Sequence, residues 1–234
     1  YVAEGSNLYI KTMQKLGLPY NRDFNDGSQY GVGLMQYTIG NGKRCDTISS
    51  LIEPILHNKK LNIKLSTVVT KLIIENKKAI GVETVSNGRY EKIFGKEIIL
   101  TAGALVTPKI LMHSGVGEEK LLKNFDIKVE ENLIGVGRNL QDHHEVPFVA
   151  RAKSGFGYFK QNKGFRMIKN GIQYLLFKSG PVTSNGVDCC SFLNPENLQD
   201  QNDPKIKLYC VQIMYTDRDT KGIKPDHGVT LTSC

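Results

Sequence analysis

The sequence predicts a mixed α/β (α+β) protein that combines a strand of parallel-sheet type with an antiparallel sheet. Residues 68–94 alternate like three short strands joined by tight turns. Residues 97–102 are apolar on both faces, as in a buried parallel strand, and a helix signal follows them. Beyond residue 146, alternating segments such as residues 207–213 accompany a helical stretch at residues 165–177, which favours an antiparallel sheet with one covering helix.

Residues 1–60 predict two helices separated by a glycine-rich loop. We expect a helix over residues 4–16 with Gly17 as its C-cap residue, because Pro19 prevents continuation. A polar loop at residues 21–27 leads to a strand at residues 34–39, which the Gly-Asn-Gly of residues 40–42 breaks. A short helix at residues 49–57 is expected to bend at Pro54.

Residues 61–94 predict only strands. A short strand at residues 61–65 is expected to precede a three-stranded meander with strands at residues 68–75, 79–85 and 89–94. The turn before the last strand contains Asn87 and Gly88, which tolerate positive φ and suit a two-residue hairpin loop.

The buried strand at residues 97–102 is expected to lead into a helix that Thr107 caps and Pro108 opens. That helix should end near Ser114 and Gly115. A helix N-terminus beyond the carboxyl end of a strand favours phosphate, so the pattern permits a nucleotide site near residues 101–107. A turn with a purely structural role has the same pattern, and the pattern alone leaves both interpretations open.

The segment after Gly117 predicts a short helix that opens with Glu118 and Glu119, because acidic side chains complement the helix dipole. A strand at residues 127–129 and a loop at residues 135–143 should follow. The chain finishes on a strand pattern at residues 228–234 and begins without a start methionine or signal peptide, so we expect an internal fragment of a longer protein.

Charge and cysteine content narrow the function classes. The net charge is +8, but the lysines are scattered and no nucleic-acid-binding motif is present, so we expect no nucleic-acid partner. Five cysteines without C-x-x-C spacing argue against a disulfide framework and a zinc site, and no metal site is predicted. This cysteine usage fits a reducing compartment. The cysteines are Cys45, Cys189, Cys190, Cys210 and Cys234.

Two longer motifs resemble a known family. Residues 103–117, Gly-Ala-Leu-Val-Thr-Pro-Lys-Ile-Leu-Met-His-Ser-Gly-Val-Gly, match the second signature of the glucose–methanol–choline (GMC) oxidoreductases at every restricted position. Residues 135–143, Gly-Val-Gly-Arg-Asn-Leu-Gln-Asp-His, are similar to a later segment of the same family. The resemblance is strong from about residue 18 to residue 142 and looser to the end, with a departure at residues 45–47.

The resemblance implies a fold and a division of the chain. Residues 61–142 would be the C-terminal part of a glutathione-reductase-like FAD-binding domain. Residues 143–234 would be part of the antiparallel-sheet substrate-binding domain, and residues 1–60 part of a substrate or lid region.

The resemblance also implies a cofactor, FAD, and four residues that contact it. Val69 resembles the residue whose backbone contacts the adenine, although an ordinary strand valine would look the same. Thr101, Ala102 and Gly103 lie where the family chain passes close to the cofactor, and small residues allow that approach. The chain has no Gly-x-Gly-x-x-Gly, which would lie before Tyr1.

No catalytic residue is assigned within this chain, because the family's catalytic histidine and its partner would lie beyond Cys234. Histidine is the side chain best suited to be a base near neutral pH, but none of those present matches the family's catalytic position. They are His57, His113, His143, His144 and His227.

The resemblance implies an FAD-dependent oxidation of a primary alcohol, choline-like among the candidates, by hydride transfer to the flavin. The expected partners are a small-molecule alcohol and a quinone or another electron acceptor. We expect a cytoplasmic protein or one peripheral to the inner membrane, and this fragment alone should be inactive. The alternative is a cofactor-free binding or structural domain derived from the same fold.

Overall fold

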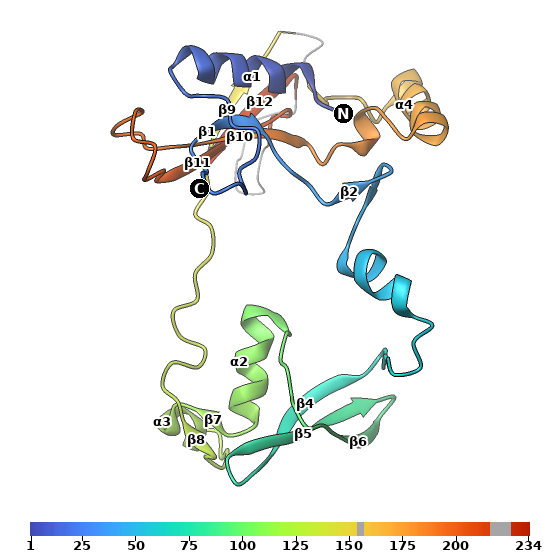
Figure 1. Ribbon diagram of the computed structural model, residues 1–234, viewed down its shortest axis with the longest axis vertical. Helices are drawn as coiled ribbons and strands as arrows, with labels where there is room; N and C mark the ends of the chain where they lie inside the picture. Colours follow the sequence, from blue (N-terminus) through green and yellow to red (C-terminus); the bar gives the residue numbers. More distant parts are fainter. Residues whose placement is uncertain (154–156, 216–225) are drawn as a thin grey trace. The chain divides into compact units, whose positions relative to one another are not determined.

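The computed structural model describes residues 1–153, 157–215 and 226–234 and divides the chain into two compact units (Figure 1). Unit 1 contains Tyr1–Leu56 and His143–Cys234, and unit 2 contains His57–Asp142. The chain therefore leaves unit 1, forms unit 2 as one continuous insertion, and returns. Both units mix helices with β-sheet, as the sequence predicts.

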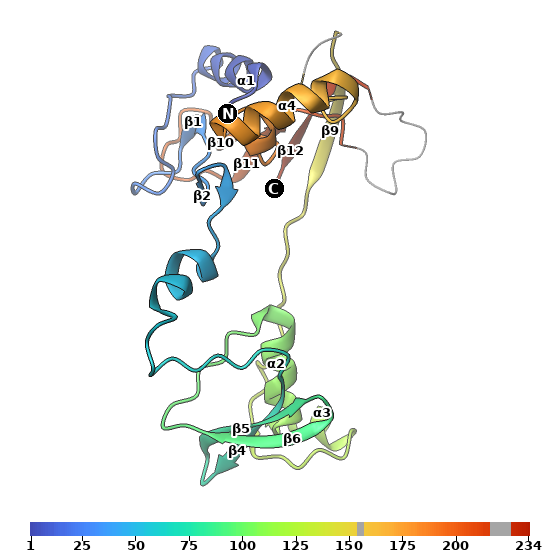
Figure 2. The ribbon, with the colours of Figure 1, turned by 90° about the vertical axis from the view of Figure 1, so that its right-hand side faces the viewer.

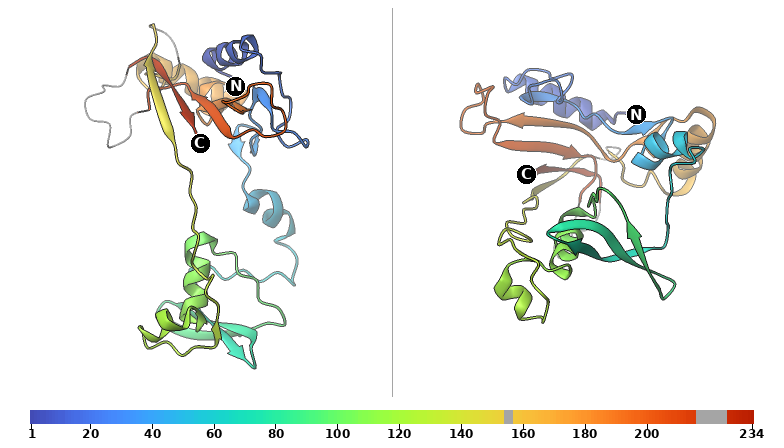
Figure 3. Two further views of the ribbon diagram at one scale, coloured as in Figure 1. Left: turned by 90° about the vertical axis from the view of Figure 1, so that its left-hand side faces the viewer. Right: turned by 60° about the horizontal axis from the view of Figure 1, so that its bottom comes forward.

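Unit 1 is built on a five-stranded antiparallel sheet with strand order β1-β10-β11-β12-β9. The left view of Figure 3 shows β9 beside β12, and the register pairs Val146 with Ser233 and Arg151 with Gly228. The predicted antiparallel sheet is thus confirmed. Its strands are β1 (Gly31–Leu34), β9 (Val146–Arg151), β10 (Val187–Leu193), β11 (Ile206–Val211) and β12 (Gly228–Ser233).

Helix α1 (Glu4–Lys15) supplies the core of unit 1, and Gly17 follows it with a φ of +102°. The α1 side chains Tyr9, Ile10 and Met13 pack against the sheet. The Tyr9 hydroxyl also donates to the Leu208 carbonyl at 3.0 Å, so its polar end is satisfied within the core. The sheet residues of this core are Val32, Cys189, Leu193 and Cys210.

The second long helix of unit 1, α4 (Gly164–Phe177), buries only Asn170 among its side chains. Residues 165–177 are thus helical as predicted, but α1 and not α4 covers the sheet core. The smaller elements of unit 1 are β2 (Ile39–Gly40), β3 (Lys43–Arg44), a π-helical turn (Ile48–Ile52) and 3₁₀ turns at Glu53–Ile55 and Pro181–Thr183.

Unit 2 contains the predicted meander, drawn in the right view of Figure 3 as a twisted antiparallel sheet. Its strands are β4 (Val68–Glu75), β5 (Lys78–Ser86) and β6 (Arg89–Phe94), in the order β4-β5-β6. Asn87 and Gly88 adopt φ values of +49° and +74° in the β5–β6 turn. Positive φ at both central residues matches the twist of the flanking strands, which confirms the predicted hairpin.

The rest of unit 2 is a helical layer with one short parallel pair. Helix α2 (Gly103–His113) is followed by β7 (Val116–Gly117), α3 (Glu119–Lys123) and β8 (Glu131–Asn132), and β7 pairs with β8 in parallel. Gly115 ends α2 with a φ of +83°, and a Cβ there would lie 2.3 Å from the Lys128 carbonyl oxygen. Only glycine fits that position without a backbone shift.

Four predicted strands are not where the sequence placed them. Residues 61–65, 97–102 and 127–129 form no strand, and the strand expected at residues 34–39 ends at Leu34 and begins at Gly31. A strand exists only where a neighbour completes its ladder of hydrogen bonds. In the described parts of the chain no segment pairs with residues 97–102, and Ile99 is 75% exposed.

No helix within the described ranges combines the length and the apolar character needed to cross a bilayer.

Candidate functional site

The four predicted cofactor contacts all lie in unit 2, on β4 and at the start of α2. Val69 is half-buried on β4, where it pairs with Thr84 of β5. Thr101, Ala102 and Gly103 are exposed, and Ala102 immediately precedes α2. The two elements pack against each other, so the structure brings them into one layer, and the role of these residues toward a cofactor stays a prediction.

Helix α2 begins five residues earlier than the sequence predicts. Gly103 is its first residue, with a φ of +85°, and Pro108 lies inside the helix and not at its start. Proline lacks an N–H, so it removes one internal hydrogen bond of the helix. The expected Thr107 cap is therefore wrong, because Gly103 can turn the chain into the helix before Thr107 is reached.

The N-terminus of α2 has the properties of an anion site. No side chain caps it, because Ala102 offers no acceptor. The first N–H groups of a helix lack internal partners and carry a partial positive charge. Small exposed residues precede them, and a Cβ added at Gly103 would meet nothing within 4 Å. A phosphate or pyrophosphate group fits this end of α2 by charge and by space.

Ser114 holds the other end of α2 on the meander. Its hydroxyl donates to the Ile110 carbonyl at 2.6 Å and accepts the backbone N–H of Leu72 at 2.7 Å. Leu72 belongs to β4, an edge strand of the meander. The hydroxyl therefore satisfies an outward N–H that would otherwise be buried without a partner.

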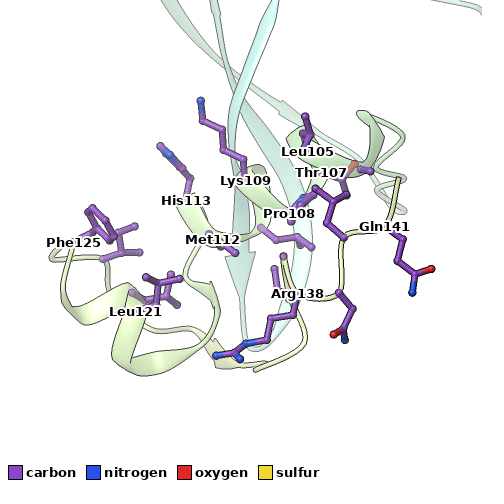
Figure 4. Close-up of a pocket in the computed structure, with 18 residues that line it drawn as sticks. Leu105, Thr107, Pro108, Lys109, Met112, His113, Leu121, Phe125, Arg138 and Gln141 are labelled. Carbon is purple, nitrogen blue, oxygen red and sulfur yellow. The ribbon is translucent and has the colours of Figure 1, made fainter. Parts of the chain in front are cut away.

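A hollow of about 1000 Å³ lies along α2 within unit 2 (Figure 4). Helix α2 contributes residues between Ala104 and His113, and Leu121, Phe125 and the loop carrying Arg138 and Gln141 line it as well. None of the four predicted cofactor contacts lines this hollow, although Ala104 directly follows Gly103. Arg138 forms an ion pair with Glu118.

A second polar cluster, which sequence reasoning missed, surrounds Asp188 of β10 in unit 1. Asp188 is 7% exposed and accepts hydrogen bonds from the Ala3 N–H and the Ser6 hydroxyl, each at 2.9 Å. The Ser184 hydroxyl donates to it at 2.7 Å and the Tyr158 hydroxyl at 3.1 Å. The carboxylate thus joins the start of α1, β10 and the segment after Gly157.

The cluster keeps its donors protonated. Burial raises the pKa of the Tyr158 hydroxyl well above its usual range, and the charge of Asp188 raises it further. Tyr158 therefore remains a hydrogen-bond donor at every physiological pH. Within the described residues, Asp188 forms no ion pair with Lys, Arg or His, so these hydrogen bonds are what compensates its burial.

Burial also keeps three thiols of unit 1 protonated, raising the pKa of Cys189 to about 12. Cys190 and Cys210 are shifted in the same direction, each to about 11. These thiols are free, and the part of the chain that the structure describes contains no cluster of metal-ligating side chains. Their position suits core packing and not nucleophilic chemistry.

The histidines do not assemble into a site. His113 lines the α2 hollow, whereas the His227 ring stacks edge-on against Phe159 in unit 1, with 5.0 Å between the ring centroids. His143 marks the boundary at which the chain returns to unit 1. No structural feature assigns a catalytic role to any of them.

Comparison with known proteins connects unit 2 and α1 to one family. The family model of the GMC oxidoreductases matches residues 3–145 of this chain. An oxygen-dependent choline dehydrogenase of Sinorhizobium fredii is 33% identical over 94% of this chain and 40% of its own length. The mitochondrial choline dehydrogenase of Mus musculus is 33% identical over 79% of this chain and 31% of its own length.

Solved structures have the same fold. Formate oxidase from Aspergillus oryzae, described in connection with modification of its FAD, superposes with a TM-score of 0.81 at 26% identity over 99% of this chain and 45% of its own. Pyridoxine 4-oxidase from Mesorbium loti has a TM-score of 0.81 at 21% identity, over 99% of this chain and 42% of its own. The chain spans about 40% of the length of the first of the choline dehydrogenases.

Proposed function

This chain belongs to the GMC oxidoreductase family, and we propose that its unit 2 binds FAD and that the complete protein oxidises a primary alcohol. The observation that carries the proposal is the N-terminus of α2. Its signature sequence forms an uncapped helix start behind three exposed small residues, with Gly103 at positive φ. That end of the helix offers N–H donors to an anionic group without a competing side chain.

We assign the cofactor contacts to Val69, Thr101, Ala102 and Gly103. The backbone of Val69 would meet the adenine, and the three residues before and at the start of α2 would allow the cofactor to approach their backbone. Ser114 keeps α2 on β4 and so sets the position of this helix within unit 2. When bound, FAD would accept a hydride from the carbinol carbon of the substrate.

We propose a choline-like primary alcohol as the substrate, because two choline dehydrogenases are among the similar proteins. Reoxidation would use a quinone, another acceptor or oxygen. None of the histidines present is assigned as the base that removes the hydroxyl proton. A cofactor-free domain with this fold remains the alternative that the following experiment excludes or supports.

The experiment is to purify the complete protein and record its visible absorbance under anaerobic conditions. We expect a flavin spectrum that choline bleaches and that 3,3-dimethylbutan-1-ol, a neutral alcohol of the same shape, bleaches more slowly. A flavin spectrum bleached equally by both would retain the flavoenzyme and remove the choline preference. A colourless protein that does not take up added FAD would support the cofactor-free alternative.

A matched pair of glycine substitutions tests the cofactor contact itself. Gly103 and Gly88 have φ values of +85° and +74°, and a Cβ at either would meet nothing within 4 Å. Replacing each with alanine should therefore cost a similar backbone strain of about 1 kcal/mol. We expect Gly103→Ala to lower the bound flavin per chain and Gly88→Ala to leave it unchanged. Equal flavin content in both variants would contradict the contact.

A further inference from the structure

The outer face of α4 is an apolar surface that no described residue of unit 1 covers. Five large side chains on this face are between 52% and 79% exposed. Their spacing of three, four, three and one residues places them on one side of a helix. Contiguous apolar patches of this kind mark interaction surfaces in folded proteins. The five residues, called here the α4 stripe, are Phe165, Ile168, Ile172, Leu175 and Leu176.

The opposite side of α4 is turned toward unit 1. Asn170 is 8% exposed and donates to the Gln161 carbonyl at 3.0 Å. Asn170 and Gly171 line a hollow of about 770 Å³ together with Met214, which follows β11. Figure 2 shows α4 in orange as a single helix along the front of this unit. The helix is therefore held through its Asn170 side, and the α4 stripe lies on the side that the described part of unit 1 leaves exposed.

The sequence stretch that contains α4 carries charge of one sign, and the described acidic residue beside α4, Asp226, lines the hollow on the Asn170 side of the helix. Residues 146–187 contain no aspartate or glutamate, whereas all the ionic side chains in this stretch are basic. In the described residues of this stretch no basic side chain forms an ion pair with a carboxylate. The basic residues are Arg151, Lys153, Lys160, Lys163, Arg166, Lys169 and Lys178.

We propose that the α4 stripe docks this protein on an anionic phospholipid surface, with α4 lying in the headgroup region. An amphipathic helix with apolar side chains on one face and Lys and Arg beside them is the type that binds in this plane. Each basic residue near an anionic leaflet adds to the attraction. The long stems of Arg166 and Lys169 can bury against the apolar region while their charges reach the phosphates.

The same charge argues against pairing of two copies through this face. A two-fold interface brings each surface patch against itself. The basic groups of one copy would then face those of the other across an apolar contact, and residues 146–187 supply no acidic side chain to compensate them. An anionic phospholipid surface would bury the apolar side chains of the α4 stripe and also neutralise the basic side chains beside it. A second copy of the chain would bury only the apolar side chains.

The first test is sedimentation of the complete protein with vesicles of phosphatidylcholine alone or with added phosphatidylglycerol. We expect binding to the anionic vesicles at least about tenfold tighter than to neutral ones, weakening as salt is raised. Ile172→Glu should weaken it by about tenfold or more. Leu8→Glu is the matched control, because Leu8 is 57% exposed on α1 outside the stripe, and this variant should bind like the wild type.

A second pair of variants tests the contribution of the basic side chains on α4 to vesicle binding. Lys169→Gln should weaken binding to anionic vesicles by about fivefold and leave the weak binding to neutral vesicles unchanged. Lys11→Gln, an exposed lysine of α1, should change neither. Equal loss in Lys169→Gln and Lys11→Gln would show that net charge alone drives binding, and it would overturn a role for α4.

A fluorescent probe keeps the proposal testable if a stripe variant fails to fold. This chain contains no tryptophan, so Leu175→Trp introduces a reporter on the stripe and Leu8→Trp a control. We expect the Leu175→Trp emission to shift to the blue only when anionic vesicles are added, and the control emission to stay unchanged. Emission that is already blue without vesicles would mean that other protein covers the stripe. A dimer in size-exclusion chromatography that Ile172→Glu dissociates would also overturn the proposal.

Discussion

Asp188 makes the start of α1 dependent on one buried carboxylate. Asp188→Asn replaces one of its acceptor oxygens with an N–H₂ group, which faces donors such as the Ala3 N–H and the Ser6 hydroxyl. We expect the free energy of unfolding to fall by about 1–3 kcal/mol, measured by urea denaturation of the complete protein. Asp203→Asn, at an exposed position, serves as the control and should change it little. Equal stability of the two variants would mean that the cluster contributes nothing.

The buried thiols predict how stability depends on alkaline pH. Burial raises the pKa of Cys189 from 9.0 to about 12 and that of Cys210 to about 11. Unfolded thiols ionise first, so their contribution is full below about pH 9 and declines as the pH rises toward the folded values. Within this window each thiol should lower the free energy of unfolding by ~1.4 kcal/mol for every unit by which the pH rises.

Urea denaturation at several pH values between about 8 and 10 measures this slope. The slope is proportional to the number of protons released on unfolding. Cys189→Ala should lower that number by about one, because one of the thiols that ionise only on unfolding is gone. An unchanged slope in this variant would show that the Cys189 thiol is not held protonated by the fold.

At the scale of elements, α2 is held on the meander by Ser114. The Ser114 hydroxyl accepts a hydrogen bond from the Leu72 N–H at 2.7 Å. Ser114→Ala removes this acceptor and leaves the N–H buried without a partner. We expect a loss of about 1–3 kcal/mol in the free energy of unfolding, and a lower flavin content if α2 positions the cofactor as proposed. Ser50→Ala, at an exposed position, is the control for loss of a serine hydroxyl. A stable Ser114→Ala variant would mean that packing alone holds α2 in place.

Elements with local partners were predictable, and those with distant partners were not. The β5–β6 hairpin depends on Asn87 and Gly88, which are adjacent in the sequence. Strand β1 pairs with β10, more than 150 residues away, and its position at Gly31–Leu34 is set by that register. The apolar pattern of residues 97–102 predicts a strand that forms only when other strands pair with it. Among the described residues no strand pairs with this segment.

The candidate site shows the same division. The family assignment from residues 103–117 and 135–143 was confirmed. Each motif consists of adjacent residues, so it can be recognised from the sequence alone. The start of α2 at Gly103 was missed, since positive φ at a glycine is invisible in the sequence. Asp188 was missed although a signal existed: it is a single acid within the apolar strand Val187–Leu193, and such a residue needs partners when it is buried.

At the scale of the whole molecule, the chain passes between its two units only twice, after Leu56 and after Asp142. Residues 57–67 contain no helix or strand, and Lys59 and Lys60 are exposed within this segment. A protease needs a segment that can unfold locally, and such connections open at little cost. We therefore expect the first tryptic cut of the complete protein to fall after Lys59 or Lys60.

Two other basic sites of unit 2 provide the comparison. Lys77 is in the tight β4–β5 turn and Arg89 is the first residue of β6, so cleavage at either requires the meander to open. Mass spectrometry of the first fragments identifies the cut. Replacing Lys59 and Lys60 together by glutamine should delay that cut and leave the flavin spectrum unchanged, because neither lysine is among the proposed cofactor contacts. A first cut at Lys77 or Arg89 would mean that the meander opens before the connection does, and that unit 2 is not an independently packed unit.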